Sequence, residues 1–344
     1  MHICHVNLAK GFSGGERQTL NLIRTLASQG EVRQSAVIRA DSPLNQHLAD
    51  LDVTIIHINH HLTGHLRRRL PQGTLLHAHD GKAVYWCALQ NLLHGNPYVI
   101  TRRVDNPLKS NRLTRMGYSR AQRVVCLSRA IAAQVGKLSG EIATSIIPSS
   151  YSAFEADADK VAEIRSQFPG KVIVGQVGKL IHHKGYQLTI EAASRLGNSQ
   201  PQMQFLFLGA GADEQELKAQ AEGLENVRFL GHQAEVGHYL AAMDLMVFPS
   251  LNEGLGSTVL EAWQHGTPVI GSDAGGIPDM IDDGVTGLLV PAGDSQALEQ
   301  AIVRLAGDAE LQARLAAGAK ARLVDFTPQS VAQRYLALYR QLLS

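Results

Sequence analysis

The sequence predicts an α/β protein made of two doubly wound, Rossmann-like domains with parallel sheets. Short apolar runs of strand length alternate with helical stretches along the whole chain, which is the pattern of βαβ units. The chain has 344 residues, enough for two domains. A polar segment at residues 149–160 divides the alternation into two halves. Right-handed crossovers make a parallel sheet the expected result in each half.

In the first half, residues 2–8 are the expected first strand. A glycine-rich turn at residues 11–16 then opens a helix that continues to about Gln29, with apolar residues at helical spacing. Further strands are expected at residues 34–38, 53–58, 74–79, 98–101, 123–127 and 144–147. Helices are expected at residues 43–51, 61–70 and 84–93, and after the capping residue Ser128.

In the second half, the same alternation continues to the end of the chain. Strands are expected at residues 172–177, 204–208, 226–230, 244–248 and 268–270. Helices are expected at residues 161–168, 236–242, from Ser257 onward, 295–305 and 309–323. Residues 328–343 carry apolar side chains on one helical face, so this terminal helix needs a surface to cover.

Composition excludes several classes of protein. Hydrophobic residues make up 44% of the chain, so extended disorder is not expected. The three cysteines, Cys4, Cys87 and Cys126, are widely spaced and fit neither a zinc cluster nor a disulfide framework. No apolar run approaches the roughly 18 residues of a membrane span, and the N-terminus lacks the pattern of a signal peptide. These features predict a cytoplasmic protein.

Charge is unevenly distributed, although the net charge is only +1. Residues 1–150 carry a balance of +10 and residues 151–344 a balance of −9. The segment from Arg102 to Arg123, with both ends included, contains seven basic residues and one acid. A basic first half predicts an anionic partner, either a glycan or lipid-linked acceptor or the acidic inner face of a membrane, with a merely solvated surface as the alternative. Aromatic residues are only 5%, which argues against nucleic acid.

One segment of the second half, residues 248–273, concentrates chemical groups. It reads as a strand end, a loop, a helix and a strand, so its loop lies where open α/β sheets bind ligands. Glu253 on the loop and Glu261 in the helix are eight residues apart, with the first-turn amides between them. Such amides bind anions and carboxylates accept from hydroxyls, so the segment suits a sugar nucleotide. An ordinary crossover with two solvated glutamates is the alternative. We expect Ser257 to cap the helix.

This segment resembles the signature of the family 4 glycosyltransferases, which are retaining enzymes of the GT-B fold, and the resemblance covers nearly the whole chain. It implies an acceptor-side domain at residues 1–150 and a nucleotide-sugar domain at 151–326. The domains would face each other across a cleft, and a terminal helix at 327–344 would cross back to the first domain.

Two further motifs complete the implied donor site. The sequence GKLIHHKG resembles the family's G-R-L-x-x-x-K-G motif, with Lys179 in place of arginine and Lys184 conforming. Lysine keeps the charge that offsets a diphosphate but loses the bidentate geometry, and two solvated loop lysines are the alternative. The turn before the first helix resembles the GG-x-E-like loop that faces the diphosphate. The implied donor-binding residues are Gly14, Gly15, Glu16, Lys179, Lys184, His232, Glu253, Gly254, Leu255, Gly256, Ser257, Thr258, Val259 and Glu261.

On the acceptor side, His77 and His79 resemble an H-x-H at a strand end that lines the cleft. A metal site would need a third ligand, and the sequence shows none at a fixed spacing. Arg103 stands where many family members carry a histidine near the transferred sugar, which suggests that a charged group binds there. The implied acceptor residues are His79, Asp80, Arg102 and Arg103, and the implied catalytic residues are Glu253, Lys184, Lys179, Arg103 and Asp105.

The resemblance therefore implies transfer of a hexosyl group, with retention, from a UDP-linked sugar to a hydroxyl of a glycan or lipid-linked acceptor. Cell-surface polysaccharide or lipopolysaccharide synthesis is the expected setting, without a metal or other cofactor. A nucleotide-sugar epimerase and a non-catalytic sugar-nucleotide-binding protein remain alternatives. The GAGADE turn lacks the third glycine of a dinucleotide site, since Glu214 stands there.

Overall fold

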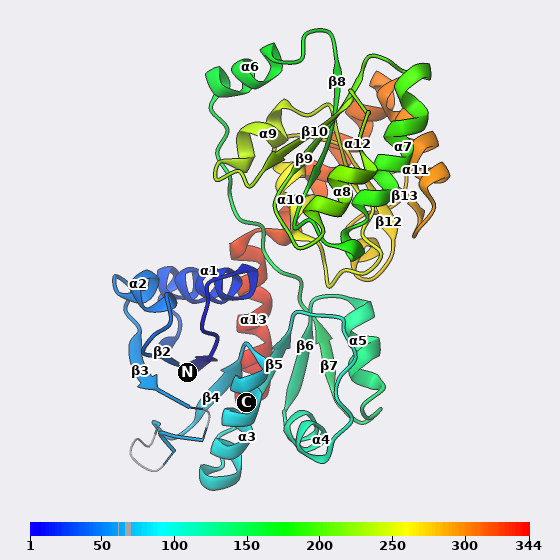
Figure 1. Cartoon of the computed structure of the whole chain (residues 1–344). Coiled ribbons are helices and arrows are strands. Elements are labelled where there is room, and N and C mark those ends of the chain that lie inside the picture. The colour runs from blue at the N-terminus through cyan, green and yellow to red at the C-terminus, as the bar shows by residue number, and fades with distance from the viewer. Residues whose placement is uncertain (61, 66–69) are drawn as a thin grey trace. The chain divides into compact units, whose positions relative to one another are not determined.

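The computed structural model describes residues 1–60, 62–65 and 70–344, which form two compact units. The first unit comprises residues 1–150 and 326–344, and the second comprises residues 151–325 (Figure 1). Half of the helix expected at 61–70, including Arg67, Arg68 and Arg69, lies outside the described residues, and residues 62–65 form turns instead of a helix. None of the described helices is both long enough and apolar enough to cross a membrane.

The first unit contains a seven-stranded parallel sheet in the order β3-β2-β1-β4-β5-β6-β7. Its strands are β1 His2–Asn7, β2 Arg33–Arg39, β3 Thr54–Ile58, β4 Thr74–Ala78, β5 Tyr98–Arg102, β6 Arg123–Cys126 and β7 Thr144–Ile146. Its helices are α1 Gly14–Gln29, α2 Leu44–Leu48, α3 Gly81–His94, α4 Arg112–Ser119, α5 Arg129–Gly136 and α13 Pro328–Leu343. The strand order reverses between β1 and β4, so the loops after these two strands part at a topological switch point.

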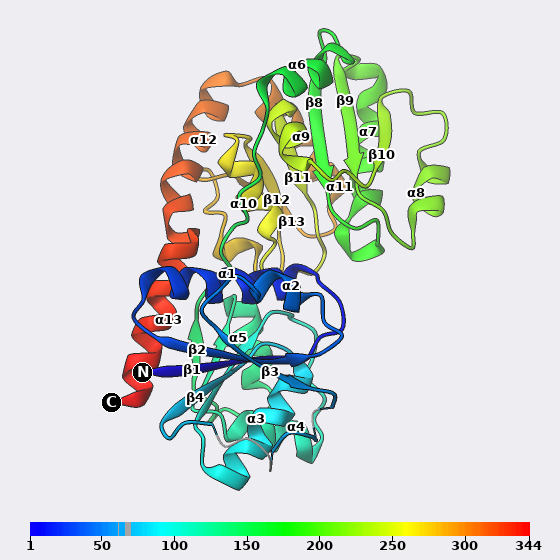
Figure 2. The ribbon, with the colours of Figure 1, turned by 90° about the vertical axis from the view of Figure 1, so that its left-hand side faces the viewer.

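Helices α1 and α13 bury their apolar faces against this sheet. Leu22 and Leu26 of α1 and Tyr335 and Tyr339 of α13 share one buried cluster with the strands. The chain therefore returns to the first unit at its end, and both termini lie there (Figure 2). The surface that the amphipathic terminal helix requires is the sheet of the first unit.

The second unit contains a six-stranded parallel sheet in the order β10-β9-β8-β11-β12-β13. Its strands are β8 Val172–Val177, β9 Met203–Leu208, β10 Val227–Gly231, β11 Leu245–Phe248, β12 Val269–Asp273 and β13 Leu288–Pro291. Its helices are α6 Ala158–Ser166, α7 Tyr186–Ser199, α8 Glu214–Gln220, α9 Val236–Ala242, α10 Ser257–Gln264, α11 Ser295–Ala306 and α12 Ala309–Leu323, with 3₁₀ turns at η1 His182–Lys184, η2 Ile277–Asp279 and η3 Val324–Phe326. The switch point of this unit lies between β8 and β11.

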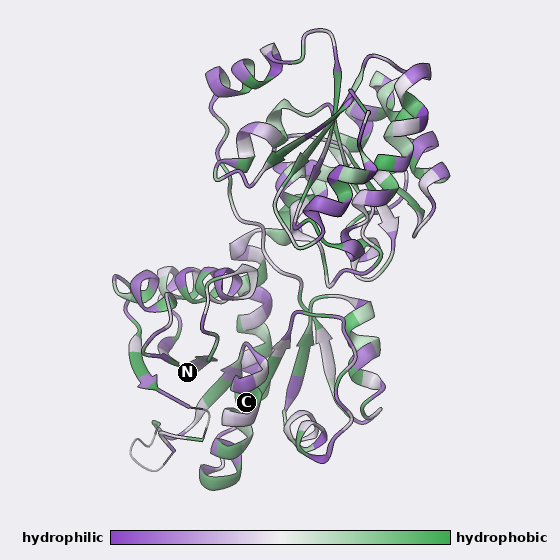
Figure 3. Cartoon of the chain, in the orientation of Figure 1, coloured by the Kyte–Doolittle hydropathy of each residue, from purple (hydrophilic) through white to green (hydrophobic). Residues whose placement is uncertain are grey.

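The hydropathy of the elements explains the layers. The strands of both sheets are mainly hydrophobic, whereas hydrophilic residues interrupt the helices (Figure 3). Strands that read as continuous apolar runs are covered on both faces, as parallel sheets require. In the second unit, buried residues of α7, α11 and α12 form one cluster with the strands.

Helix α4 is an element that the sequence did not indicate, as are α7, α8 and β13. Asn111 caps it by accepting a hydrogen bond from the Thr114 amide at 2.8 Å. Leu113 and Met116 remain 53% and 41% exposed, so the helix does not bury a regular apolar face. Because helix prediction relies on such a face, the segment read as irregular basic sequence.

Candidate functional site

The second unit brings Lys184 and Glu253 together at its switch point. Lys184 ends η1 in the loop after β8, and Glu253 lies in the loop after β11. Nζ of Lys184 pairs with Oε2 of Glu253 and lies 5.3 Å from the centroid of the Phe248 ring. The two charged side chains are 19% and 18% exposed. The pair is thus shielded from most solvent, which strengthens its attraction, but a ligand can still reach it.

Glycines allow these loops to approach each other closely. Gly185, directly after Lys184, has φ +74°, and a Cβ there would lie 2.0 Å from the Pro249 carbonyl oxygen. Gly275 has φ +55°, and a Cβ there would lie 2.2 Å from the carbonyl oxygen of Glu253. The Gly276 amide donates to that same oxygen at 2.8 Å. Glu253 is therefore held by backbone contacts that no larger residue at position 275 would permit.

The start of α10 differs from the expected one. Gly256, with φ +93°, is the N-cap, and Ser257 is the first helical residue, so the prediction that Ser257 caps the helix is wrong. A Cβ at Gly256 would lie 2.7 Å from the Phe248 ring, which explains the glycine. The Val259 amide donates to the Gly256 carbonyl at 3.0 Å. The amides of Ser257 and Thr258 donate to no acceptor among the described residues, so both can bind an anion at this turn.

The other predicted donor residues of this unit lie on the same or neighbouring strand-end loops. Gly254 and Leu255 are buried between Glu253 and α10, and Glu261 is partly exposed on α10. Lys179 is exposed on the loop that also carries Lys184, and His232 is exposed after the edge strand β10. The structure thus brings together the pair, the two amides and the loop between them, and leaves Lys179 and His232 at the surface.

In the first unit, Arg103 lies beside His79 and the glycine-rich turn. Nη2 of Arg103 is 3.3 Å from Nδ1 of His79. A Cβ on Gly15 would lie 3.8 Å from Cδ of Arg103, whereas a Cβ on Gly14 would meet no atom within 4 Å. Burial lowers the pKa of Arg103, and the charges of nearby groups such as Tyr335 raise it. An arginine nevertheless stays protonated, so a fixed positive charge faces an open turn.

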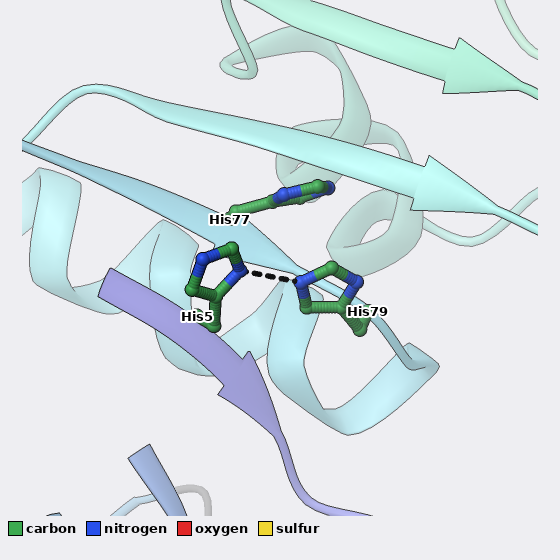
Figure 4. A group of neighbouring side chains, drawn as sticks. All are labelled: His5, His77 and His79. Carbon is green, nitrogen blue, oxygen red and sulfur yellow. Dashed lines mark hydrogen bonds between the residues drawn. The ribbon is translucent and has the colours of Figure 1, made fainter. Parts of the chain in front are cut away.

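His5 joins His77 and His79 as the third histidine of a cluster, and the sequence did not indicate it. It comes from β1, where it pairs in register with His77 of β4, and the ligand atoms of His5, His77 and His79 lie within 4.8 Å of one another (Figure 4). Burial is the main cause that lowers the pKa of all three, to about 4 for His5 and well below the usual value for His77 and His79. The three rings are therefore neutral near pH 7.

The hydrogen bonds of this cluster suit a polar network better than a metal ion. A guanidinium has only donors, so Nδ1 of His79 must accept from Arg103 and carries no proton. A metal on Nε2 of His79 would place a proton on Nδ1, facing those donors, whereas metal-bound histidines normally donate their second N–H to an acceptor. His77 also has both nitrogens occupied, by Tyr339 at 2.6 Å and Thr101 at 2.7 Å.

Asp80, an acid predicted to bind substrate, has structural partners. Oδ1 of Asp80 accepts from the amides of Lys82 and Ala83 at the start of α3, and Oδ2 accepts from the amide of Leu8. Asp80 therefore caps α3 and ties it to the loop after β1. Burial nevertheless raises the Asp80 pKa.

The remaining polar residues of this side differ in how far they are engaged. Oε2 of Glu16 accepts from the backbone and hydroxyl of Ser13 at 2.9 and 2.7 Å, which closes the first turn of α1. Arg102 is 9% exposed and donates to Asn106. Asp105 forms no hydrogen bond or ion pair with the described residues. Binding roles for these residues stay predictions.

Known proteins resemble this chain along its length. A family model described as "Glycosyl transferases group 1" matches residues 158–322. The lipopolysaccharide core biosynthesis glycosyltransferase LpsE of Rhizobium meliloti (strain 1021) is 29% identical over 360 residues, covering 98% of both chains. The 2-deoxystreptamine N-acetyl-D-glucosaminyltransferase of Streptomyces fradiae is 31% identical over 304 residues, covering 79% of this chain and 72% of that one.

The solved structures agree with the fold. The crystal structure of Anabaena HepE in complex with UDP superposes with a TM-score of 0.85 at 21% identity, covering 99% of this chain and 100% of that one. The same protein in complex with UDP-glucose gives 0.81 at 22% identity, with the same coverage. The predicted GT-B fold, with two Rossmann-like parallel-sheet domains, is confirmed. With a curated relative 31% identical over most of its length, the chain belongs to the group 1 glycosyltransferases.

Proposed function

We propose that this glycosyltransferase is a retaining family 4 enzyme that moves a hexosyl group from a UDP-sugar to a hydroxyl of an anionic glycan. The observation that carries the proposal is the Lys184–Glu253 pair at the β8–β11 switch point, beside the open first turn of α10. The crystallised complexes of HepE with UDP and UDP-glucose support a UDP-linked donor. The name of LpsE supports an acceptor in the lipopolysaccharide core.

The chemistry of the pair fits the charges that transfer creates. Cleavage of the anomeric C–O bond leaves negative charge on the diphosphate and positive charge on the sugar. Lys184 has three N–H donors, and Glu253 occupies one, so two remain for phosphate oxygens. The amides of Ser257 and Thr258 add two further donors placed in advance. The second carboxylate oxygen of Glu253 can accept from a sugar hydroxyl, and we assign Glu261 to the ribose and exposed Lys179 to the outer phosphate.

We further propose that the reaction needs no metal ion or other cofactor. The lysines and the helix-start amides supply positive charge where the leaving diphosphate develops its own. In the first unit, the His79 tautomer that Arg103 requires argues against a metal at the histidine cluster. The fixed charge of Arg103 and the positive charge balance of residues 1–150 favour an acceptor that carries phosphate or carboxylate groups.

The basic surface also suggests where the enzyme meets a membrane. Helix α4 exposes two apolar side chains, Leu113 and Met116, beside exposed Arg112 and Arg115. Apolar side chains that insert into the headgroup region and cations that attract acidic lipids act together in peripheral binding. We propose that α4 docks the first unit on an anionic membrane face.

Transfer assays test the function. Purified enzyme is incubated with a panel of UDP-sugars and truncated lipopolysaccharide cores, and NMR follows the anomeric configuration of the product. We expect one UDP-sugar to give a product with retained configuration in buffer containing a chelator. Lys218→Ala is the matched control for Lys184→Ala, since this lysine of α8 is exposed, pairs with Glu214 of its own helix and lies near an aromatic ring, that of Phe229.

Two results would replace the proposal by an alternative. Conversion of the donor with no acceptor present would indicate an epimerase. Binding of UDP-sugars without turnover on any acceptor would indicate a non-catalytic binding protein. An inverted product, or activity only with added metal, would contradict the retaining or the metal-independent part of the proposal.

A further inference from the structure

Hydrogen bonds from Arg103 run in one direction through the histidine cluster. Because Nδ1 of His79 accepts from Arg103, the proton of His79 lies on Nε2. That nitrogen is 3.0 Å from Nδ1 of His5, which must therefore accept. The proton of His5 then lies on its own Nε2, which donates to Oε1 of Gln34 at 3.1 Å. Nε2 of Gln34 completes the chain by donating to the Ile23 carbonyl of α1 at 3.1 Å.

The chain is buried, which makes its direction stable. His5, His79 and Gln34 are 1%, 5% and 5% exposed. Water cannot replace a lost partner at such positions, so reversing one ring would leave an unsatisfied donor or acceptor at substantial cost. The ring of His77 lies 3.9 Å from that of His79, centroid to centroid, and restricts its rotation. The structure thus fixes both the position and the tautomer of His79.

One N–H group of the Arg103 guanidinium forms no hydrogen bond with the described residues. Its Nε is buried and has no hydrogen-bond partner among the described residues. A buried N–H without an acceptor costs free energy, and a guanidinium binds oxyanions through neighbouring donors. The glycine turn beside the side chain adds no Cβ that would block an approach. An oxyanion bound at Arg103 would supply the missing acceptor.

We propose that His79, His5 and Gln34 are positioning residues that orient the Arg103 guanidinium toward an anionic oxygen of the substrate. This inference rests on the proposed function, because it takes Arg103 as a substrate contact. The oxygen belongs either to the diphosphate of the donor or to a charged group of the acceptor. Both sources share the chemistry of an oxyanion, and kinetics separate them by which KM changes.

The tautomers can be measured without any activity assay. In ¹⁵N-labelled protein near pH 7, long-range proton–nitrogen correlations distinguish a protonated Nε2 from a protonated Nδ1. We expect His5 and His79 both to carry the proton on Nε2. A proton on Nδ1 of His79 in the native protein would overturn the chain. If the enzyme showed no transfer activity, the proposed function would be wrong. The tautomers measured by NMR would still test the hydrogen-bond chain by themselves.

Two substitutions at His79 separate positioning from a merely structural role. In His79→Asn the amide oxygen can occupy the place of Nδ1 and accept from Arg103, whereas in His79→Gln the amide reaches the place of Nε2. We expect His79→Asn to keep kcat/KM within about threefold and His79→Gln to lower it about 10- to 100-fold, as loss of a charged hydrogen bond predicts. The loss should appear in the KM of either the donor or the acceptor.

Thermal unfolding and circular dichroism check that each variant is folded. His5→Asn provides a second comparison. Its amide oxygen can accept from Nε2 of His79, so we expect activity close to that of His79→Asn, whereas His5→Leu should behave like His79→Gln. Equal activity of the asparagine and glutamine variants at position 79, in folded proteins, would overturn the proposal.

Discussion

Acidification from pH 7 to pH 5 should destabilise the first unit through its three buried histidines. His5, His77 and His79 are 1%, 0% and 5% exposed. Burial first, and then the neighbouring histidines and charges, lowers their pKa values, to about 4 for His5 and well below 6.5 for the other two. The native state therefore holds these rings neutral over a pH range in which the unfolded chain protonates them.

The sign and size follow from proton linkage. A histidine in the unfolded chain titrates near pH ~6.5, so below this pH the unfolded state binds more protons and the free energy of unfolding falls. The stabilisation is fully present above pH 6.5 and is lost as the pH falls toward the native pKa. Each ring contributes a slope of about 1.4 kcal/mol per pH unit, and three give about 4 kcal/mol per unit. From pH 7 to pH 5 the loss reaches about 6 kcal/mol, which is comparable with the whole stability of a domain.

The two tryptophans of the chain allow each unit to be followed separately. Trp86 lies in α3 of the first unit and Trp263 in α10 of the second. In a Trp263→Phe background, urea unfolding monitored by fluorescence at pH 5 to 8 reports the first unit. Replacing His5 by Gln should reduce the slope to about two thirds. A wild-type slope below about 1 kcal/mol per pH unit would refute the reasoning, because the native rings would then be taking up protons.

Three further predictions concern the loops and the surface. Lys184→Ala and Glu261→Ala should each lower kcat about 10²- to 10³-fold in steady-state assays while the thermal unfolding temperature stays near that of the wild type; near wild-type turnover of either variant would contradict its assigned role. Gly275→Ala should lower the free energy of unfolding by about 1–3 kcal/mol and raise the KM for the donor, because it strains the backbone against Glu253. An unchanged midpoint of urea unfolding together with an unchanged KM would contradict this prediction. Replacing both Leu113 and Met116 by Glu should abolish co-sedimentation with vesicles of acidic lipids, and persistent binding would exclude α4 as the docking element.

Much of the fold follows from the sequence because buried parallel strands are short apolar runs between helices. The pairing of Lys184 with Glu253 illustrates the same logic at the site. Each follows a strand, and the two strands, β8 and β11, are neighbours at the point where the strand order reverses. A sequence that alternates regularly therefore indicates which loops meet, although not which atoms pair.

The alternation of strands and helices does not predict which side chains form hydrogen bonds with each other. His5 and His77 are 72 residues apart and meet only because β1 and β4 pair in a particular register. The positive φ of Gly256, which moves the helix start by one residue, also depends on the Phe248 ring packed against it. A polar residue between apolar neighbours inside a strand, as His5 between Cys4 and Val6 in β1, is the signal that could have indicated a buried network.

Binding of UDP tests the central claim most directly, because the claim is that Lys184 and the start of α10 hold the diphosphate. Calorimetric titrations compare UDP with uridine, for the wild type, Lys184→Ala and the control Lys218→Ala. The account predicts that Lys184→Ala weakens UDP binding about tenfold or more, leaves uridine binding unchanged, and differs in this from Lys218→Ala. Equal affinity of the wild type and Lys184→Ala for UDP would contradict it.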